Sequence, residues 1–342
     1  MRRIYALTVL LAAVVFAGPA AAEKTDVVLL VNGNAITGEV KSLDFGALSY
    51  KTDSMGTVTI DWEDVVGVTS KQTLQVEVAD GTRYFGHLNT SDERFHISVV
   101  TLSQTFDLAT SQVVRMTPID TDESFLERLD GSFSLGFTTQ KSSEVTTLNV
   151  ATDMNYRTQR YLVGLQANAT YTEQPDQPET ERANIGVNYQ RFRGNRWYTE
   201  WFTSWERNDE LGILSRYTAG GGFGRYIVQS NRNEFSLAAG LNASRELYTG
   251  DTETSTIAEG RVQIRYLHRS IEPEASATLT TNVYPTLDDF SKYRSETDIT
   301  FRREIVEDLF LDVTLYQSYT SDPPEGAASS DYGVTTSLGY SW

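Results

Sequence analysis

Few side chains in this 342-residue sequence could carry out covalent chemistry or hold a metal ion. The chain has no cysteine, which excludes thiol catalysis, disulfide bridges and thiolate metal sites. Its three histidines, His87, His96 and His268, are widely spaced, whereas a zinc site needs several ligands close together. We therefore predict no catalytic residue, no cofactor and no metal site, and we expect that the protein is not an enzyme.

Two local motifs suggest ligand binding, and each has a simpler explanation. The glycines of 220–224 resemble a phosphate-binding loop, but the Lys-Ser/Thr pair that completes such a loop is absent, and close packing within a strand explains them. The acidic segments 288–289 and 322–325 offer the oxygen ligands that Ca²⁺ prefers. Solvated acidic loops are the simpler interpretation of these segments.

The charge balance excludes one class of partner. The chain has 46 acidic and 29 basic residues, for a net charge of −17. Nucleic-acid binding depends largely on clustered Lys and Arg, so we predict no nucleic-acid partner. The charges of greatest interest alternate with apolar residues in the last third of the chain: Glu259, Arg261, Arg265, Arg294, Glu296, Asp298, Arg302 and Asp312.

Strands with one apolar and one polar face are the elements that must position these charges. In 331–342, Tyr332, Val334, Leu338 and Tyr340 share one face, and small or polar residues occupy the other. Each such segment is long enough for the ~9–11 residues of a tilted transmembrane strand. We count twelve: 129–140, 145–157, 160–171, 182–192, 196–206, 213–226, 234–246, 256–268, 274–284, 292–304, 308–319 and 331–342. We predict an all-β fold in which residues 129–342 form a transmembrane antiparallel β-barrel of about 12 strands.

The connections between these strands alternate between short and long. Tight turns such as 158–159 and 193–195 are typical of the periplasmic side, and acidic segments such as 173–181 and 321–330 of the extracellular side. An even number of strands places the first and last residues of the barrel segment on the same side, the side of the short turns. A soluble β-sandwich would also alternate, but its water-facing side would carry more charge than the Gln- and Asn-rich faces seen here.

The lumen of the predicted barrel should be predominantly acidic. By strand parity its charges are Asp130, Asp153, Glu200, Glu234, Glu259, Glu274, Glu296, Asp298, Glu304 and Asp312, with Arg157, Arg216, Arg261, Arg265, Arg294 and Arg302. A water-filled lumen of this kind would favour cations. Alternatively, Arg261, Arg265, Arg294 and Arg302 pair with Glu259, Glu296, Asp298 and Asp312 and fill a narrow barrel.

The chain before the barrel divides into three parts. Residues 1–22 have the basic start, apolar run and small-residue cleavage site of a secretory signal peptide. Residues 23–70 and 71–120 then repeat one pattern, in which Gly33 and Gly38 match Gly81 and Gly86 at an offset of 48. The Asn-Gly and Asp-Gly turns of this pattern are typical of hairpins. We predict two small five-stranded β modules in the periplasm, followed by a linker over 121–128.

Aromatic residues mark the expected membrane boundaries and the end of the barrel. Trp197 and Trp205 are about 26 Å apart along one strand, a spacing that predicts a place near opposite interfaces. Tyr340 and Trp342 place aromatic residues on the terminal strand, as outer-membrane assembly signals do. We therefore expect contact with membrane lipid and with the barrel-assembly machinery.

The sequence also resembles a known family. The segments 129–157, 214–226 and 31–38 resemble the salt-induced outer-membrane proteins of Gram-negative bacteria, catalogued as a domain of unknown function. The resemblance covers about the last two-thirds of the chain and brings no catalytic residues with it. It implies an outer-membrane location with lipid and lipopolysaccharide as surroundings, and it implies that the leading modules are SH3-like.

Three classes of function follow from these predictions. The first is an outer-membrane barrel that acts as a passive channel for small cations or solutes, or as an envelope component in salt stress. The second is a periplasmic module that binds a partner while the barrel serves only as its anchor. The third is a barrel hydrolase, for which His268 would need a serine within hydrogen-bond reach.

Overall fold

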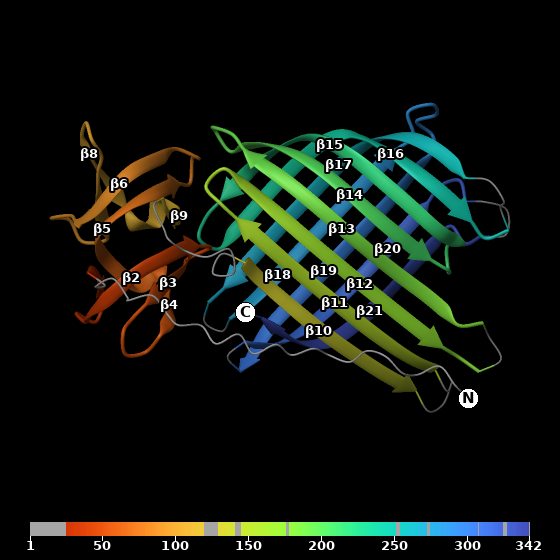
Figure 1. Cartoon of the computed structure of the whole chain (residues 1–342), viewed down its shortest axis with the longest axis horizontal. Helices are drawn as coiled ribbons and strands as arrows, with labels where there is room; N and C mark the ends of the chain where they lie inside the picture. Colours follow the sequence, from red (N-terminus) through yellow and green to blue (C-terminus); the bar gives the residue numbers. More distant parts are fainter. Residues whose placement is uncertain are drawn as a thin grey trace, which may run out of the picture.

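The computed structural model describes residues 25–119, 129–140, 145–175, 178–250, 254–271, 274–306, 308–323 and 327–341. The predicted signal peptide 1–22, the linker 121–128 and Trp342 lie outside the described residues. The described residues form a small β module and a β-barrel, and the module lies against one end of the barrel (Figure 1). The described part of the chain contains no helix of the length and apolar character that a membrane span requires.

The predicted barrel is confirmed as a closed antiparallel sheet of twelve described strands. They are β10 (Leu129–Gln140), β11 (Val145–Arg157), β12 (Tyr161–Glu173), β13 (Thr180–Phe192), β14 (Trp197–Asn208), β15 (Ile213–Gln229), β16 (Asn233–Tyr248), β17 (Ser255–Ser270), β18 (Ala275–Pro285), β19 (Tyr293–Val306), β20 (Leu309–Thr320) and β21 (Ser330–Ser341). Each boundary lies within three residues of its prediction, because the alternation of apolar and polar residues sets the extent of each strand.

The outer wall of the barrel is apolar, as a lipid-facing surface requires. Side chains on this wall pair across neighbouring strands, as Leu165 does with Val187. Closure of the sheet satisfies backbone hydrogen bonds that lipid could not satisfy. Exposed apolar residues of the wall include Phe133, Leu135, Phe137, Leu148, Leu165, Ile185, Val187, Trp201, Tyr217, Phe223, Leu237, Leu241, Val262, Ile264, Phe301, Leu315, Val334 and Leu338. The chain is thus a transmembrane β-barrel.

The first and last strands of the barrel meet along a short seam. β10 and β21 are paired over four residue pairs, from Ser132 with Ser341 to Leu135 with Leu338. By contrast, β10 pairs with β11 over twelve residue pairs. Both strands meet at the end of the barrel that carries the short turns. The first and last residues of the barrel segment therefore lie on the same side, as the even strand number predicts.

The described N-terminal strands form one nine-stranded sheet, with β9 beside β2 and β5. The strands are β1 (Asp26–Leu30), β2 (Ala35–Asp44), β3 (Ala47–Lys51), β4 (Thr57–Asp61), β5 (Val65–Val78), β6 (Arg83–Thr90), β7 (His96–Val100), β8 (Thr105–Ala109) and β9 (Val113–Pro118), with short 3-10 turns η1 (Trp62–Asp64) and η2 (Thr110–Gln112). Its core contains Val28, Val40, Leu43, Leu48, Tyr50, Trp62, Leu74, Val76, Leu88, Ile97 and Met116.

The two sequence repeats share a strand and a core. The first part of β5 pairs with β1, and its last part, Leu74–Val78, pairs with β9. The equivalent turns η1 and η2 are also joined, because the indole nitrogen of Trp62 donates to the carbonyl oxygen of Thr110 at 2.8 Å. The predicted division between residues 70 and 71 falls inside β5. We therefore describe residues 25–119 as one module, and the SH3-like character of each repeat stays a prediction.

Candidate functional site

The interior of the barrel is the largest concentration of charged and polar side chains in the described residues. Backbone alternation places these groups inside while the apolar residues face outward. Buried polar residues of the barrel include Ser132, Ser134, Asn149, Glu200, Arg216, Thr218, Glu234, Ser236, Asn242, Ser244, Glu246, Glu259, Arg261, Arg294, Asp312 and Ser318. Of the sixteen lumen charges predicted from the sequence, the eight singled out from Glu259 to Asp312 lie on β17, β19 and β20 within this set or beside it.

Arg294 lies at the centre of the first cluster of lumen charges. Its Nε and Nη2 donate to the two carboxylate oxygens of Glu259 at 2.8 and 3.1 Å, and its Nη1 donates to Glu296 at 2.5 Å. The other donors to Glu259 are Asn242 Nδ2 at 2.6 Å and Ser244 Oγ at 2.9 Å. Arg294 and Glu259, two of the eight residues that the alternative of a paired lumen named, are therefore joined by hydrogen bonds to both carboxylate oxygens.

Two further pairs lie nearer the short turns. Arg302 donates from Nε and Nη2 to the two carboxylate oxygens of Asp312, both at 2.9 Å, across neighbouring strands. Arg265 pairs with Glu234 of β16 at 3.0 Å rather than with one of the four acidic residues proposed for it. Its side chain is 40% exposed, so this pair is in contact with water.

Arg261 reaches across the lumen instead of along the wall. Its Nη1 donates to Glu200 Oε1 of β14 at 2.6 Å, although three strand boundaries separate β17 from β14. Its guanidinium also lies 4.2 Å from the ring centroid of Phe202, and its Nε donates to Asn282 at 3.2 Å. This bridge narrows the lumen on the β14–β17 side.

A second bridge crosses the barrel near the long loops. Arg182 of β13 lies over the ring of Tyr316 of β20, with 3.8 Å from the guanidinium carbon to the ring centroid, and lies 4.0 Å from Asp331 of β21. The amide of Asn208 donates to the same Asp331 carboxylate at 3.0 Å. Residues from opposite sides of the ring therefore meet at this end.

Part of the lumen remains open to water. Asp153 and Asn155 of β11, Gln166 and Asn168 of β12, and Asp298 of β19 face inward by strand parity, yet their side chains are exposed. Within the described residues, Asp153 and Asp298 have no ion pair within 4.0 Å. Because a filled barrel would bury these groups, we conclude that water-sized space lies in the lumen beside β11 and β12 and beside β19. These strands belong to the half of the ring that runs from β19 through β20, β21 and β10 to β12, which we call the open side.

Comparison with known proteins identifies the family of this barrel. A sequence profile described as "Protein of unknown function, DUF481" matches residues 134–342. The chain belongs to the DUF481 family. The match spans all but the first residues of the barrel, and it leaves the N-terminal module of this DUF481 protein outside it.

Comparison with solved structures gives matches of low identity and low TM-score. The translocator domain of the autotransporter NalP from Neisseria meningitidis is 10% identical, with 62% of this chain and 87% of that chain covered and a TM-score of 0.36. The beta domain of the Bordetella autotransporter BrkA is 10% identical over 63% and 97%, with a TM-score of 0.31. The outer membrane channel DcaP of Acinetobacter baumannii is 12% identical over 93% and 94%, with a TM-score of 0.30. No curated protein matches the sequence.

The short-turn mouth of the DUF481 barrel faces the module across a charged space that we call the vestibule. It is bordered by Asp44 and Arg115 of the module and by Arg157, Glu234 and Arg269 of the barrel. Arg115 donates to Asp44 with N–O distances of 2.7 and 2.9 Å. The Asp44 side chain is 40% exposed while that of Arg115 is 7% exposed, so an accessible carboxylate lies beside a buried guanidinium.

The pKa values of this pair reflect the charges around it. Burial raises the pKa of the Asp44 carboxyl, but Arg115, Arg157 and Arg269 lower it by more, so its net pKa is below its usual value. Burial lowers the pKa of Arg115, whereas Asp44 and Glu77 raise it, and the net pKa is higher than usual. Both groups are therefore fully charged at neutral pH.

The residues predicted as membrane markers lie on the outer wall. Trp197 is 47% exposed, with the guanidinium of Arg225 at 5.6 Å from its ring, and Trp205 is half-buried on the same face. The neighbouring Trp201, 50% exposed, packs 5.6 Å from Tyr189. The latter contact belongs to a row of aromatic rings across β11 to β14 that the sequence analysis did not identify: Tyr156, Tyr161, Tyr189 and Trp201.

Tyr340, one of the two residues predicted as an assembly signal, lies at the seam between β10 and β21. Tyr340 is 52% exposed on the outer wall and is paired with Phe133 of β10 and Leu309 of β20. Its hydroxyl donates to Asp308 at 3.4 Å. The predicted assembly role of Tyr340 and Trp342 stays a prediction, with Trp342 outside the described residues.

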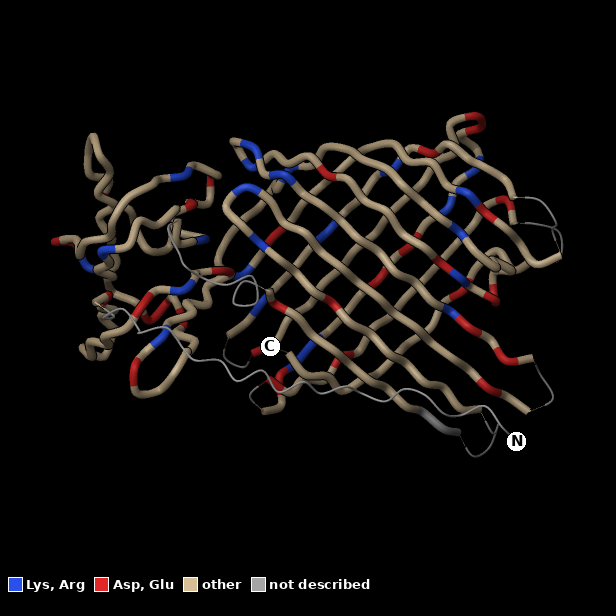
Figure 2. The backbone as a smooth tube through the Cα atoms, in the orientation of Figure 1, with Lys and Arg blue, Asp and Glu red and all other residues tan. Residues whose placement is uncertain are grey.

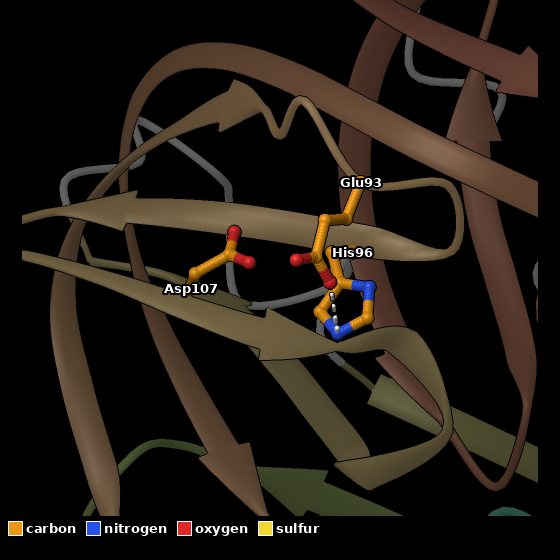
Figure 3. Close-up of side chains that lie close together, drawn as sticks. All are labelled: Glu93, His96 and Asp107. Carbon is orange, nitrogen blue, oxygen red and sulfur yellow. Dashed lines mark ion pairs between the residues drawn. The ribbon is translucent and has the colours of Figure 1, made fainter.

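One cluster of possible metal ligands lies in the module and was missed by the sequence analysis. Glu93, His96 and Asp107 bring their ligand atoms within 4.8 Å of one another on the outer side of β7 and β8 (Figure 3). His96 Nε2 lies 3.7 Å from Glu93, and its Nδ1 lies 3.2 Å from the carbonyl oxygen of Arg94. Ser98 donates to Asp107 at 3.1 Å. The strand pairing of Ser98 with Asp107 was the signal that could have revealed this cluster.

The structure shows the surroundings of the glycine segment, the acidic loops and the barrel histidine. A Cβ at Gly220 would meet Phe202, and one at Gly224 would meet the ring of Tyr198, so these glycines make room for aromatic side chains inside the barrel. In the acidic loops, Asp289 accepts from Ser291, and Asp322 accepts from Lys292. His268 lies 2.9 Å from the side-chain oxygen of Asn233, at the short-turn end.

Proposed function

We propose that this DUF481 protein is an outer-membrane channel that carries small, predominantly cationic solutes through a narrow lumen. The observation that carries the proposal is the set of polar side chains on β11, β12 and β19 that face inward and remain exposed. A barrel that served only as an anchor would have no need for water-accessible carboxylates in its interior. The closed sheet and its apolar wall support the membrane location.

The charge of the open side supports a preference for cations. Asp153 and Asp298 lie there without an ion pair among the described residues, whereas Arg261, Arg294 and Arg302 are each held by a carboxylate. Unpaired carboxylates in a wall of low dielectric produce a negative potential that attracts cations. The ion pairs made by Arg261, Arg294 and Arg302, in contrast, occupy part of the lumen and set the width of the passage.

Ion conductance of the full chain in planar bilayers tests this proposal. We expect small conductance steps and a reversal potential, in a KCl gradient, that shows K⁺ passing more readily than Cl⁻. Absence of conductance at every salt concentration and voltage would reject the channel. A preference for Cl⁻ would retain the channel but contradict the assigned role of Asp153 and Asp298.

The same proposal places the module in the periplasm. In bacterial barrels the short turns are periplasmic, and the module contacts four of them. Protease added to intact cells should therefore cut long connections such as 173–181 and leave residues 25–119 intact. Cleavage of the module from outside would show the opposite orientation.

A membrane-anchored binding module is the second candidate function. The observation in its favour is the shared core of residues 25–119, which is large enough to present a rigid surface to a periplasmic partner. Under this alternative the purified protein would carry no current, so the bilayer measurement separates the two functions. The Glu93–His96–Asp107 cluster would be part of the presented surface.

Two further expectations belong to the proposal. We propose no enzymatic step, because the partner found for the barrel histidine, His268, is Asn233; a phospholipid hydrolysis assay on the purified protein tests this expectation. A role in the envelope under salt stress is supported by the family resemblance. Comparing growth of a deletion strain with its parent at low and high NaCl tests that role.

A further inference from the structure

Four short turns of the barrel contact the module, and together they belong to eight strands. Gln159 of the β11–β12 turn donates to the carbonyl oxygen of Pro118 at 3.1 Å. Arg232 of the β15–β16 turn donates to Glu63 at 2.7 and 2.8 Å. The other two contacts are made by Arg196 of the β13–β14 turn, close to Gly81, and by Arg269 before the β17–β18 turn, 5.6 Å from the ring of Phe45.

The module lies across the mouth of the barrel and not only against its rim. The Asp44 carboxylate interacts electrostatically with Arg157 of β11 and with Arg269 of β17, two strands on different sides of the ring. Arg115, its partner, shares a small cavity with Glu234 of β16. Figure 1 shows the module covering the short-turn end.

The two surfaces have opposite charge. The module contains twelve acidic and six basic residues over 25–119, for a net charge of −6. The four short turns and their strand ends, 157–161, 191–197, 225–234 and 265–271, contain nine arginines and one acidic residue, Glu234. Figure 2 shows the basic positions at the barrel end that faces the module. Attraction between such surfaces is long-ranged and weakens as salt is added.

The contact between them is largely polar and contains a small cavity. A cavity of about 10 Å³, close to the size of one water molecule, lies between Phe45 and Val114 of the module and Gln229 and Ser230 of the barrel. The side-chain oxygen of Gln229 is buried there and has no hydrogen-bond partner among the described residues. Interfaces within a chain that are polar and wet are usually reversible.

From these observations we propose that the N-terminal module is a reversible plug, which closes the short-turn mouth of the lumen when docked and opens it when displaced. The proposal rests on the proposed channel function. The docked state is held by the charge complementarity of the two surfaces, with Glu63–Arg232 at the rim and Asp44–Arg115 over the mouth. Displacement needs no change in the barrel wall.

A disulfide between module and barrel tests the plug directly. A Cβ at Gly46 would lie 3.2 Å from the Cβ of Asn231, near the ~3.5–4.5 Å found in disulfides, and the chain has no other cysteine. The Gly46→Cys/Asn231→Cys protein should conduct poorly at every salt concentration when oxidised. Reduction should restore current, while the Asn231→Cys protein should not respond to reduction.

A second measurement keeps the test independent of that disulfide, because Gly46 has φ +75° and a cysteine there is strained. In the Asn231→Cys protein, the module covers the new thiol. Its labelling by a membrane-impermeant maleimide should rise several-fold between 0.1 and 1 M KCl, as the Debye length falls from ~10 to ~3 Å. Glu63→Arg should give fast labelling at low salt, and adding Arg232→Glu should slow it again. Glu210→Cys, at an exposed position in the β14–β15 turn, is the control.

The possible outcomes separate the plug from the channel. Equal, non-zero currents in the oxidised and reduced double-cysteine protein would overturn the plug and leave the channel. Salt-independent labelling of Asn231→Cys would also overturn it, because the module would then never leave the mouth. If no current is found in any state, the channel proposal fails, and the plug fails with it.

Discussion

Arg232 and Glu63 are 169 residues apart in the sequence, yet they form a two-point ion pair that joins the barrel to the module. Both side chains remain about half exposed. Exposed pairs of this kind contribute little each, about 0.2–1 kcal/mol. The docking of the module therefore depends on the sum of several weak contacts, which is a suitable basis for a contact that must open.

The Arg232–Glu63 pair gives the first prediction. A double-mutant cycle with Arg232→Ala and Glu63→Ala should yield a coupling free energy of about 0.2–1 kcal/mol at 0.1 M KCl, and near zero at 1 M. The measurement is the free energy of docking, obtained from thiol labelling of Asn231→Cys in each background. A coupling that does not change with salt would show that the contact is not electrostatic.

The Asp44–Arg115 pair predicts a dependence of module stability on pH. Because the pKa of Asp44 is lowered on folding, its stabilising contribution is fully present above its ordinary pKa near 3.8 and is lost as the pH falls through the folded value. The hydrogen-exchange protection factors of β2 and β9, which are corrected for the intrinsic pH dependence of exchange, should therefore fall below about pH 4. In Asp44→Asn, which leaves Arg115, Arg157 and Arg269 without this carboxylate, exchange should be faster at pH 7 and less sensitive to acid.

A third prediction concerns the bridge across the lumen. Arg261→Met should leave the carboxylate of Glu200 buried without its partner and destabilise the barrel by about 3–5 kcal/mol. The temperature at which the folded band converts to the slower band in detergent gels should fall. Arg207→Met is the matched control, because Arg207 is 37% exposed and its partners Glu181 and Asp209 are 45% and 21% exposed, and it should lower this temperature much less.

The open side of the lumen gives the fourth prediction. Asp298→Asn should reduce the preference for K⁺ over Cl⁻, with a larger effect at low salt, where the Debye length increases to ~30 Å at 0.01 M. Glu296→Asn should act mainly on stability, because Glu296 is bonded to Arg294. Asp289→Asn, in an exposed loop, serves as the control for bilayer measurements. Unchanged selectivity in Asp298→Asn would contradict its assigned place in the conducting path.

The last prediction tests the terminal strand. Deleting residues 340–342 removes Tyr340, which is paired with both neighbours of β21. We expect the shortened chain to be degraded or retained in the periplasm, measured by cell fractionation and by the heat-dependent gel shift. Normal insertion would show that neither Tyr340 nor Trp342 is needed as an assembly signal.

The barrel could be predicted from the sequence because alternation reports directly on which face of a strand meets lipid. The same parity placed Arg294, Glu259, Arg302 and Asp312 inside. It did not assign the individual pairs, of which Arg302–Asp312 joins neighbouring strands and Arg294–Glu259 spans β18. It could not find the Arg261–Glu200 bridge, because that contact depends on the width of the lumen and on the reach of a long side chain.

The docking of the module against the barrel also could not be predicted from the sequence. Strand parity describes each sheet by itself and says nothing about which end of a barrel another domain covers. A signal was nevertheless present, since arginines gather in the short turns while the leading module is acidic. The Glu93–His96–Asp107 cluster was missed because His96 was judged by its distance from other histidines and not by its neighbours across the strands.

The short seam between β10 and β21 also dictates an order of events during folding. The other strand pairs of the ring join segments that follow one another in the chain, whereas this pair joins strands about 200 residues apart. Closing so long a loop costs more entropy than forming a hairpin, and among the described residues four pairs compensate for it. The ring must therefore shut last, from a curled sheet whose hairpins are already formed, and the same four pairs are the first that mechanical or thermal stress would part.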